Sequence, residues 1–250
     1  MRGLLTRRRA AALAAAAALA AAWLLVGRRF GVPDRGRYPV RGIDVSHHQG
    51  PILWGEVASA GISFAYVKAS EGGDYRDPRF AENWAAAARA GLRLGAYHYF
   101  TFCRDGQSQA ENFLAALSTS VPAALPPALD LEFRGNCARR PSPEELRADL
   151  LDFVGRVESA TGQVPVYYVT PEFLRAYGDA LPEDAGIWVR STFWRPGRLD
   201  RPWVLWQYSG HARVRGVTGP VDADVFNGSR EGWAAFLARS RPAGATASAD

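Results

Sequence analysis

Short apolar runs alternate with longer stretches of helical periodicity from about residue 40 onward. The apolar runs are rich in β-branched and aromatic residues, which is typical of strands. They predict eight strands, at residues 40–45, 62–68, 92–100, 128–132, 164–169, 186–189, 204–208 and 221–225. The Ala- and Leu-rich stretches predict helices at residues 54–59, 78–90, 107–117, 143–160, 171–177 and 230–238. Ser142 with Glu145 three residues later forms a capping box at the start of the longest helix.

The connections between these elements indicate the fold class. Helices separate the first five strands, which is the pattern of parallel strands joined by crossovers, whereas loops separate the last three. We therefore predict an α/β fold, an irregular (β/α) barrel similar to a TIM barrel, with an open doubly wound sheet as the alternative. No glycine-rich phosphate loop follows any predicted strand, so we expect no nucleotide and no other cofactor.

An uncharged, mostly alanine run occupies residues 10–26 and is flanked by arginines on both sides. Its length lies between that of a signal-peptide core and that of a membrane span. We expect a cleaved export signal or a retained anchor in the inner membrane, and the alternative is an Ala-rich soluble helix. The chain then divides into a hydrophobic N-terminal segment at 1–38, a periplasmic or extracellular barrel at 39–238 and a loose tail at 239–250.

Composition and charge limit the partners of the body. The 250 residues are 48% hydrophobic, enough for one sizeable domain, which we expect to be a monomer. The formal charge is +5, yet residues 1–41 carry nine arginines against one acid, and the remainder carries 21 basic and 24 acidic residues. The body has no basic stripe with interleaved aromatics, which argues against nucleic acid as a partner.

The chain has two cysteines, Cys103 and Cys137, as expected of an exported protein in an oxidising compartment. We predict that they form a disulfide, and two buried free thiols are the alternative. Neither a CxxC motif nor a Cys/His ligand spacing is present, so we expect no metal site.

Residues able to carry chemistry gather near the carboxyl ends of the predicted strands. In a barrel those ends form one face, where active sites are built. The set comprises Asp44, Lys68, Glu71, His98, Asp130, Glu132, Tyr168, Trp188, Gln207 and Asp222.

Asp130 and Glu132 are two residues apart on one predicted strand. At strand spacing both side chains point to the same side, with Cα atoms about 6.6 Å apart. Two acids in a partly desolvated pocket raise the pKa of one of them, which yields a carboxylic acid able to protonate a leaving oxygen. Glu132 is our candidate acid, because it is longer and nearer the barrel mouth. The alternative is a structural carboxylate pair bound to arginine.

The other candidates complete this face. Asp44 ends an otherwise apolar strand, and because Ser46 is the better helix cap we give Asp44 a role in the pocket together with Asp222. Lys68 is the only lysine in the chain, and we interpret it as the ion-pair partner of an acid rather than as a nucleophile. The candidates for substrate binding, in part by stacking on sugar rings, are Lys68, Glu71, Tyr99, Tyr168, Trp188 and Gln207.

Several of these stretches together resemble the glycoside hydrolase family 25 lysozymes, the Chalaropsis-type N-acetylmuramidases. They run in family order from about residue 40 to residue 228. The matching stretches are Gly42-Ile43-Asp44-Val45-Ser46, Tyr66-Val67-Lys68-Ala69-Ser70-Glu71-Gly72, Gly95-Ala96-Tyr97-His98-Tyr99-Phe100, Leu129-Asp130-Leu131-Glu132, Val166-Tyr167-Tyr168, Trp206-Gln207-Tyr208 and Gly219-Pro220-Val221-Asp222.

The resemblance implies hydrolysis of the β-1,4 bond between N-acetylmuramic acid and N-acetylglucosamine in peptidoglycan, in an irregular barrel without a metal. By position Glu132 resembles the general acid, with Asp130 beside it and with Asp44 and Asp222 completing an acidic floor. In that family the acetamido group of the substrate has been proposed as the nucleophile, so Asp130 is either the nucleophile or the residue that orients this group.

Three positions depart from the family pattern. His48 stands where the family often has an aromatic residue, and Asp224 where it often has Asn. Arg190-Ser191 follows the sixth strand, where many members have a small residue and then Tyr. These departures concern the substrate side of the site. A peptidoglycan-binding barrel without catalysis, and a glycosidase acting on another N-acetylglucosamine polymer, are the alternative functions.

Overall fold

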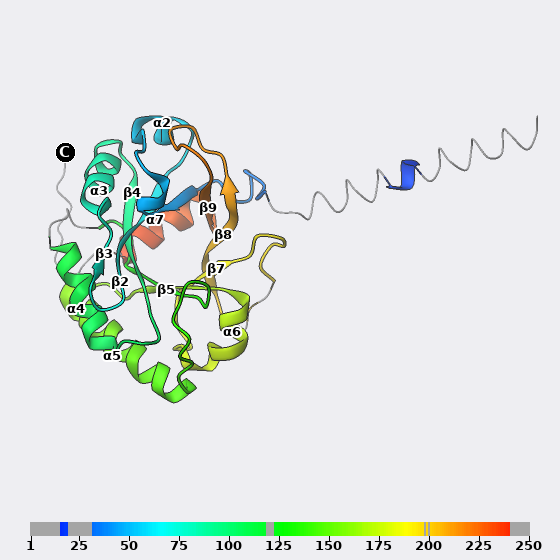
Figure 1. Ribbon diagram of the computed structural model, residues 1–250. Helices are drawn as coiled ribbons and strands as arrows, with labels where there is room; N and C mark the ends of the chain where they lie inside the picture. Colours follow the sequence, from blue (N-terminus) through cyan, green and yellow to red (C-terminus); the bar gives the residue numbers. More distant parts are fainter. Residues whose placement is uncertain (1–15, 20–31, 119–122, 198, 200, 241–250) are drawn as a thin grey trace, which may run out of the picture.

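The computed structural model describes residues 16–19, 32–118, 123–197, 199 and 201–240 (Figure 1). Most of the apolar run at 10–26 and residues 241–250 of the expected tail lie outside the described residues. In the part of the chain that is described, no helix is long and apolar enough to cross a membrane.

Eight strands close into a barrel, which confirms the predicted irregular barrel and excludes the open sheet. They are hydrogen-bonded in the order β1-β9-β8-β7-β6-β5-β4-β2, and a parallel pairing of β1 with β2 closes the ring. A short strand β3 (Tyr75–Arg76) adds to the end of β2 outside the ring. The barrel strands are β1 (Arg41–Val45), β2 (Phe64–Glu71), β4 (Arg93–Tyr99), β5 (Ala128–Leu131), β6 (Val166–Val169), β7 (Ile187–Arg190), β8 (Trp203–Ala212) and β9 (Val221–Phe226).

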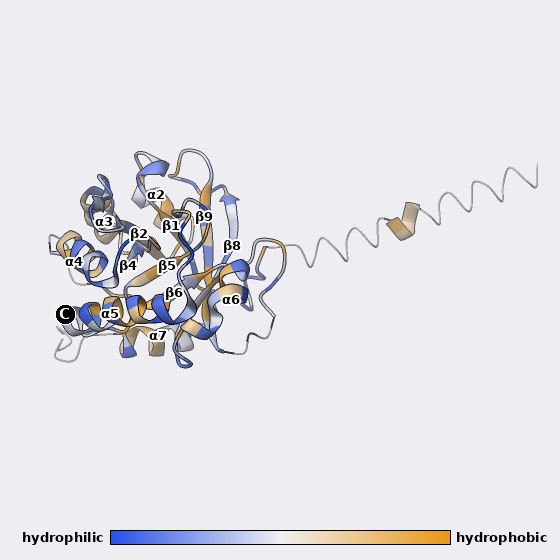
Figure 2. Cartoon of the chain, turned by 60° about the horizontal axis from the view of Figure 1, so that its bottom comes forward, coloured by the Kyte–Doolittle hydropathy of each residue, from blue (hydrophilic) through white to orange (hydrophobic). Residues whose placement is uncertain are grey.

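Helices cover the outer wall where strands are joined by crossovers, and the second half of the barrel has little helical cover (Figure 1). The capping box of Ser142 and Glu145 is present at the start of α5. Figure 2 shows hydrophobic residues on the strands and on the helix faces turned toward them. The helices are α2 (Trp54–Ser59), α3 (Phe80–Arg89), α4 (Gly106–Leu117), α5 (Pro143–Thr161), α6 (Pro171–Tyr177) and α7 (Arg230–Arg239), with short 3-10 turns η1 (His47–Gln49) and η2 (Gly178–Ala180).

The last strand corrects the expectation that Asp222 lies near the carboxyl end of its strand. β9 runs antiparallel to both of its neighbours, with Asp222 opposite Asp44 of β1. The connection between Ala212 and Val221 is too short for a crossover, so β8 and β9 form a hairpin. As a result the start of β9, and not its end, lies at the barrel mouth, where the other strands end.

The barrel has two apolar layers. The outer layer packs strands against helices and includes Leu129 and Leu131, as the alternation along β5 predicts. The inner layer fills the lower half of the barrel, where α7 closes the end opposite the mouth: Trp233 contacts Phe64 with ring centroids 5.1 Å apart. The body also includes Tyr38, which the expected boundary assigns to the N-terminal segment, because its ring is buried against Trp203 and Trp206.

Two glycines make room for the inner rings. A Cβ on Gly42 would lie 2.2 Å from the ring of Phe64, and one on Gly95 would lie 2.3 Å from the ring of Tyr66. Both distances are too short for a side chain to be accommodated without moving the aromatic residue. These glycines belong to the stretches Gly42-Ile43-Asp44 and Gly95-Ala96-Tyr97, so the same motifs that carry polar residues to the mouth also let aromatic rings fill the barrel below it.

Candidate active site

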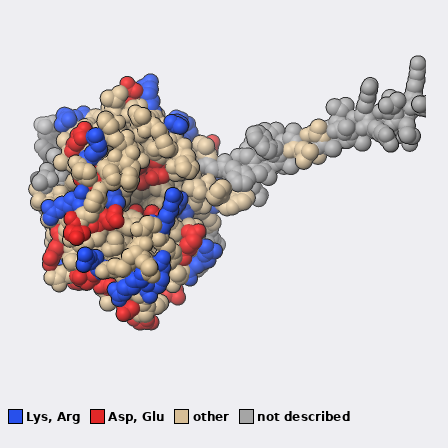
Figure 3. Space-filling model, viewed as in Figure 1, with Lys and Arg blue, Asp and Glu red and all other residues tan. Residues whose placement is uncertain are grey.

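A pocket of about 90 Å³ opens at the mouth of the barrel. All four predicted catalytic acids line it, together with three of the predicted substrate-binding residues. In the view of Figure 3, with α7 at the back, acidic side chains line a central hollow and basic side chains lie along its rim. The lining residues are Asp44, Tyr97, Asp130, Glu132, Tyr168, Trp188, Gln207 and Asp222.

The alternation of side chains along each strand explains this convergence. Asp44 on β1 and Asp130 on β5 each lie two residues beyond a residue that faces the barrel interior, and so face the interior themselves. Asp222 is the second residue of β9 and reaches the same level because that strand is antiparallel. The placement of Asp222 at the mouth therefore depends on the strand direction that the sequence analysis did not predict.

A chain of buried hydrogen bonds crosses the floor of the pocket. The hydroxyl of Tyr168 donates to Oε1 of Gln207 at 3.0 Å, and Nε2 of Gln207 donates to Oδ2 of Asp44 at 2.8 Å. On the other side, Nε1 of Trp188 donates to Oδ1 of Asp224 at 2.9 Å. Because each donor has one buried acceptor, these side chains hold one another in place.

Asp44 and Asp224 join the two sides of this chain. Their carboxyl groups lie close enough for each to influence the pKa of the other. Burial is the largest influence on both, and it raises both pKa values well above the usual range, assisted by the neighbouring charge of Asp222. The pair therefore retains a proton where exposed carboxyls would be ionised.

Asp130 and Glu132 form a second carboxyl pair. Burial raises the pKa of both, and the charge of Glu132 adds to the increase at Asp130. Oδ1 of Asp130 is buried and has no hydrogen-bond partner among the described residues. The side chain of Glu132 is 18% exposed and so reaches solvent at the mouth. The carboxyl of Glu132 is therefore accessible to a bound molecule. The carboxyl of Asp130, below it, has an oxygen free to accept a hydrogen bond.

The structure adds three residues that were not among the predicted catalytic or substrate-binding residues. Tyr97 lines the pocket, Arg190 lies with Nη1 3.4 Å from Oε2 of Glu132, and Asp224 is fully buried under the floor. Each is two residues from a predicted site residue on the same strand. The period of two along a strand is the signal that could have identified them.

Lys68, Glu71 and Tyr99 lie beside the pocket rather than in its lining. Nζ of Lys68 forms an ion pair with Oε2 of Glu71 at 2.7 Å and lies 5.0 Å from the ring centroid of Tyr99. The hydroxyl of Tyr99 donates to the carbonyl of Arg134 at 2.7 Å. These three residues therefore contact one another beside the pocket and hold the loop that follows β5.

His98 does not belong to the site. It is fully buried on the outer side of β4, with Nδ1 2.8 Å from Oγ of Ser70 and Nε2 3.2 Å from Oε1 of Gln109. Its ring packs against Phe113 and Phe153, and burial lowers its pKa to about 3. The strand alternation that turns Tyr97 and Tyr99 inward turns His98 toward the helices.

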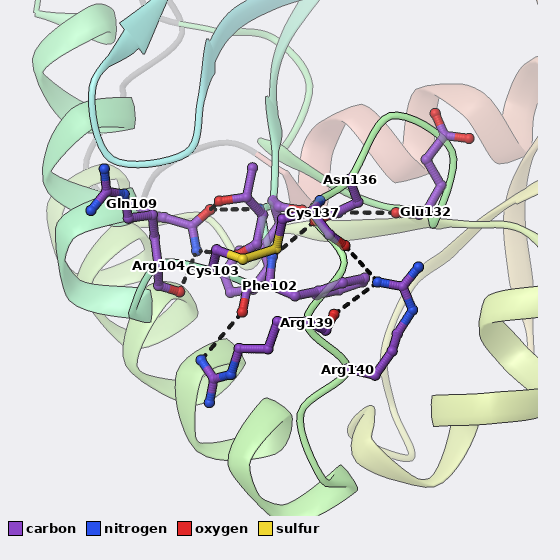
Figure 4. Close-up of a disulfide and its surroundings, with 11 residues drawn as sticks. Phe102, Cys103, Arg104, Gln109, Glu132, Asn136, Cys137, Arg139 and Arg140 are labelled. Atoms are coloured by element: carbon purple, nitrogen blue, oxygen red, sulfur yellow. Dashed lines mark hydrogen bonds between the residues drawn. A yellow bond between two sulfur atoms is a disulfide. The ribbon is translucent and has the colours of Figure 1, made fainter.

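A disulfide supports the loop that carries Glu132. Cys103 and Cys137 are joined, with Cα atoms 6.3 Å apart (Figure 4). Next to it, Nδ2 of Asn136 donates to the carbonyls of Phe100 and Glu132, at 2.8 and 3.0 Å. Figure 4 shows the side chain of Glu132 pointing away from the disulfide. This loop has no periodic pattern from which the role of Asn136 could have been predicted.

Among the residues that the structure describes, no group of three or more His, Cys, Asp and Glu side chains is placed to hold a metal ion. What the arrangement offers chemically is two carboxyl pairs with raised pKa values, one of them at the mouth, in a pocket with aromatic walls. Such a site can donate a proton to a leaving oxygen.

The chain is similar to known proteins in both sequence and fold. The chain is 37% identical over 204 residues to lysozyme M1 of Streptomyces globisporus, covering 76% of this chain and 68% of that protein. It is 34% identical over 216 residues to the uncharacterized protein YegX of Escherichia coli (strain K12), covering 84% and 78% of the two chains. A solved family 25 glycosyl hydrolase from Bacillus anthracis matches with a TM-score of 0.74 at 34% identity, covering 83% of this chain and 97% of that one.

The family model described as glycosyl hydrolases family 25 matches residues 43–217, which run from β1 to the connection between β8 and β9. The match includes Asp44, Asp130 and Glu132, and Asp222 follows five residues after its end. With a match over most of the barrel and relatives above 30% identity over most of its length, the chain belongs to glycosyl hydrolase family 25.

Proposed function

We propose that the protein is a muramidase that cleaves the β-1,4 bond between N-acetylmuramic acid and N-acetylglucosamine in peptidoglycan. The observation that carries the proposal is the convergence of Asp44, Asp130, Glu132 and Asp222 on one small pocket at the barrel mouth. Family membership and the similarity to lysozyme M1 support the choice of substrate.

Glu132 acts as the general acid. It is the member of the Asp130–Glu132 pair that reaches the mouth, and burial keeps its pKa above that of an exposed glutamate. A substrate whose scissile bond lies across the mouth would receive the proton of Glu132 on the glycosidic oxygen as the bond breaks. A general acid of this kind contributes about 10²–10⁴-fold to the rate.

Asp130 works from below the bond. Its unused Oδ1 can accept a hydrogen bond from an amide N–H, and the acetamido group of the sugar carries one. That bond would favour the ionised form of Asp130 and leave the proton of the pair on Glu132. The free acceptor therefore favours the route in which Asp130 orients the acetamido group over the route in which it attacks the sugar.

Asp44, Asp222 and Gln207 shape the pocket around the reacting sugar. Gln207 is fixed by Tyr168 and Asp44, and the charge of Asp222 acts on Asp130. Positive charge that develops on the sugar ring in the transition state would be stabilised by these carboxyls. Aromatic walls from Tyr97, Tyr168 and Trp188 would pack against the ring.

The test is product release from purified peptidoglycan by the full chain. We expect new reducing ends and muramic-acid-terminated fragments by mass spectrometry, and a loss of about 10²–10⁴-fold in rate for Glu132→Gln. Glu111→Gln on the exposed face of α4 is the matched control and should act as the wild type. An unchanged rate for Glu132→Gln would contradict the assignment.

Two other results would replace the proposal. Retention of peptidoglycan without any fragment would indicate a binding barrel, and faster cleavage of N-acetylglucosamine oligomers than of peptidoglycan would indicate a different glycan. The disulfide and this substrate both support a location of the body outside the cytoplasm. Sequencing the mature N-terminus decides whether the hydrophobic segment at 1–38 is cleaved or retained.

A further inference from the structure

Arg190 occupies an unusual place beside the candidate acid. It is the last residue of β7, and its backbone is fixed by pairing with Gln207 of β8. Its Nη1 lies 3.4 Å from Oε2 of Glu132, and the two side chains are 32% and 18% exposed. The guanidinium is thus at the mouth, in contact with the carboxyl that we assign to proton transfer.

This contact opposes the proposed role of Glu132. A general acid must hold a proton, whereas the charge of Arg190 lowers the pKa values of Glu132, Asp130 and Asp222 from the levels that burial sets. The contact therefore favours the resting state in which Glu132 has lost its proton.

The other charged groups around Glu132 do not replace Arg190. Asp130 on β5 and Asp222 on β9 are acids, and Lys68 on β2 is already 2.7 Å from Glu71. Arg134 lies in the loop after β5 and is exposed to solvent. Arg190 is the cation that forms an ion pair with Glu132 among the described residues.

The geometry of the pair indicates that it can be exchanged. A guanidinium prefers two parallel hydrogen bonds to one carboxylate, at about 2.7–2.9 Å. Arg190 makes one longer contact to Glu132, and its guanidinium forms no other hydrogen bond to the described residues. A carboxylate of a bound molecule at the mouth could take both donors and displace Glu132.

We propose that Arg190 binds a carboxylate of the glycan substrate and that this exchange releases Glu132 to take up the proton it then donates. The inference rests on the proposed function and specifies its substrate as an anionic glycan. One proton enters from solvent on binding and one ion pair replaces another, so charge balances. The carboxylate is the lactyl group of muramic acid or a carboxylate of the stem peptide attached to it.

Binding measurements test the exchange without catalysis. The probes are N-acetylglucosaminyl-N-acetylmuramic acid with a free lactyl carboxylate, the same disaccharide carrying a tripeptide so that the lactyl group is an amide, and neutral chitobiose. Calorimetry between pH 5 and 7, in buffers that differ in ionisation enthalpy, counts the protons taken up by the full chain. We expect uptake with an anionic probe and none with chitobiose.

Substitution of Arg190 should remove this behaviour selectively. For Arg190→Gln we expect binding of the anionic probe to weaken by about 10–100-fold with loss of proton uptake, and chitobiose binding to stay unchanged. Arg190→Lys should retain part of the affinity, because it keeps the charge and loses the planar fork. Arg175→Gln on the exposed side of α6 is the control and should match the wild type. The anionic probe that responds identifies the source of the carboxylate.

Kinetics give an independent readout. In Arg190→Gln the KM for the muramyl glycan should rise, and the descending limb of the kcat profile should move to higher pH, because the remaining acid loses a neighbouring cation. Equal pH limbs and equal anionic-to-neutral affinity ratios in wild type and Arg190→Gln would overturn the inference. A wild type that binds with proton uptake but cleaves nothing would instead overturn the proposed function alone.

Discussion

The upper and lower halves of the barrel interior are built by the same strands and have opposite chemistry. The lower half is filled by rings from β2, β9 and α7, including Phe64, Phe226 and Trp233. The upper half holds five carboxyl groups, those of Asp44, Asp130, Glu132, Asp222 and Asp224. Trp188 lies at the boundary: its ring packs 4.7 Å from that of Tyr66 and its Nε1 donates to Asp224.

This difference shows that the same strands stabilise the fold at one end of the barrel and carry reactive groups at the other. Apolar burial in the lower half contributes about 1.5–3 kcal/mol for each large side chain. Buried carboxyls with raised pKa values and the unpartnered Oδ1 of Asp130 cost free energy in the upper half. The lower half therefore stabilises a fold whose mouth is electrostatically unfavourable.

The largest loss of stability is expected when a large ring is removed from the lower half. Trp233→Ala removes the ring that contacts Phe64 and Phe226 and should reduce the free energy of unfolding by about 3–5 kcal/mol. Chemical denaturation measures this, and the rate per folded molecule should hardly change. Leu151→Ala, at an exposed position of α5, is the control and should cost less than about 1 kcal/mol. Equal losses in the two variants would show that α7 does not seal the barrel.

The disulfide provides the second test, since it supports the upper half from outside the barrel. Replacing Cys103 and Cys137 by serine should cost roughly 3–4 kcal/mol, because the bridge closes a loop with a sequence separation of 34. Activity should also fall, because the loop that holds the backbone of Glu132 is loosened. Intact mass before and after reduction and alkylation shows whether the bridge is present. Two thiols that alkylate without a reductant would contradict it.

The smallest effect should come from neutralising the carboxyl under the floor. Asp224→Asn keeps an acceptor for Trp188 and gives Asp44 a donor, so we expect a gain of about 1–2 kcal/mol at pH 7. Burial raises the folded-state pKa of Asp224 above the unfolded value of about 3.9. The stability contributed by its protonated form is present below the unfolded pKa and is lost as pH rises through the folded pKa.

Thermal unfolding as a function of pH measures this difference. The advantage of Asp224→Asn over wild type should be close to zero near pH 4 or below and should grow toward neutral pH. Asp184→Asn, at an exposed position before β7, is the matched control for loss of one negative charge. An advantage that is the same at all pH values would mean that the carboxyl is not the cause.

Much of the fold followed from local patterns. Alternating and continuous apolar runs identified the eight barrel strands within a few residues, and the capping box fixed the start of α5. β6 begins at Val166 rather than at 164, because Val164 is exposed before the chain enters the barrel. The short β3 was not predicted, because two residues are too few to show the alternating pattern of a strand.

Strand spacing brought the predicted residues together where it governed their orientation. Asp130 with Glu132 at i and i+2 lies in the pocket, and so do Asp44, Tyr168, Trp188 and Gln207 at strand ends. The expectation that His98 lies at the mouth was wrong, because this residue alternates with the inward-facing Tyr97 and Tyr99 along β4. The contact between Arg190 and Glu132 joins β7 to the end of β5, and no spacing within the sequence reports such a distance.

The sequence by itself determined which residues face inward, because alternation along a strand is a local property of the backbone. It also determined the identity of the carboxyls, the family resemblance and the location of the positive charge in residues 1–41. The tertiary structure decided the direction of β9, the pairing of Asp44 with Asp224 and the place of Arg190 beside Glu132. The physical reason is that barrel closure brings together strands far apart in the chain, and burial then sets the charge of the groups that meet.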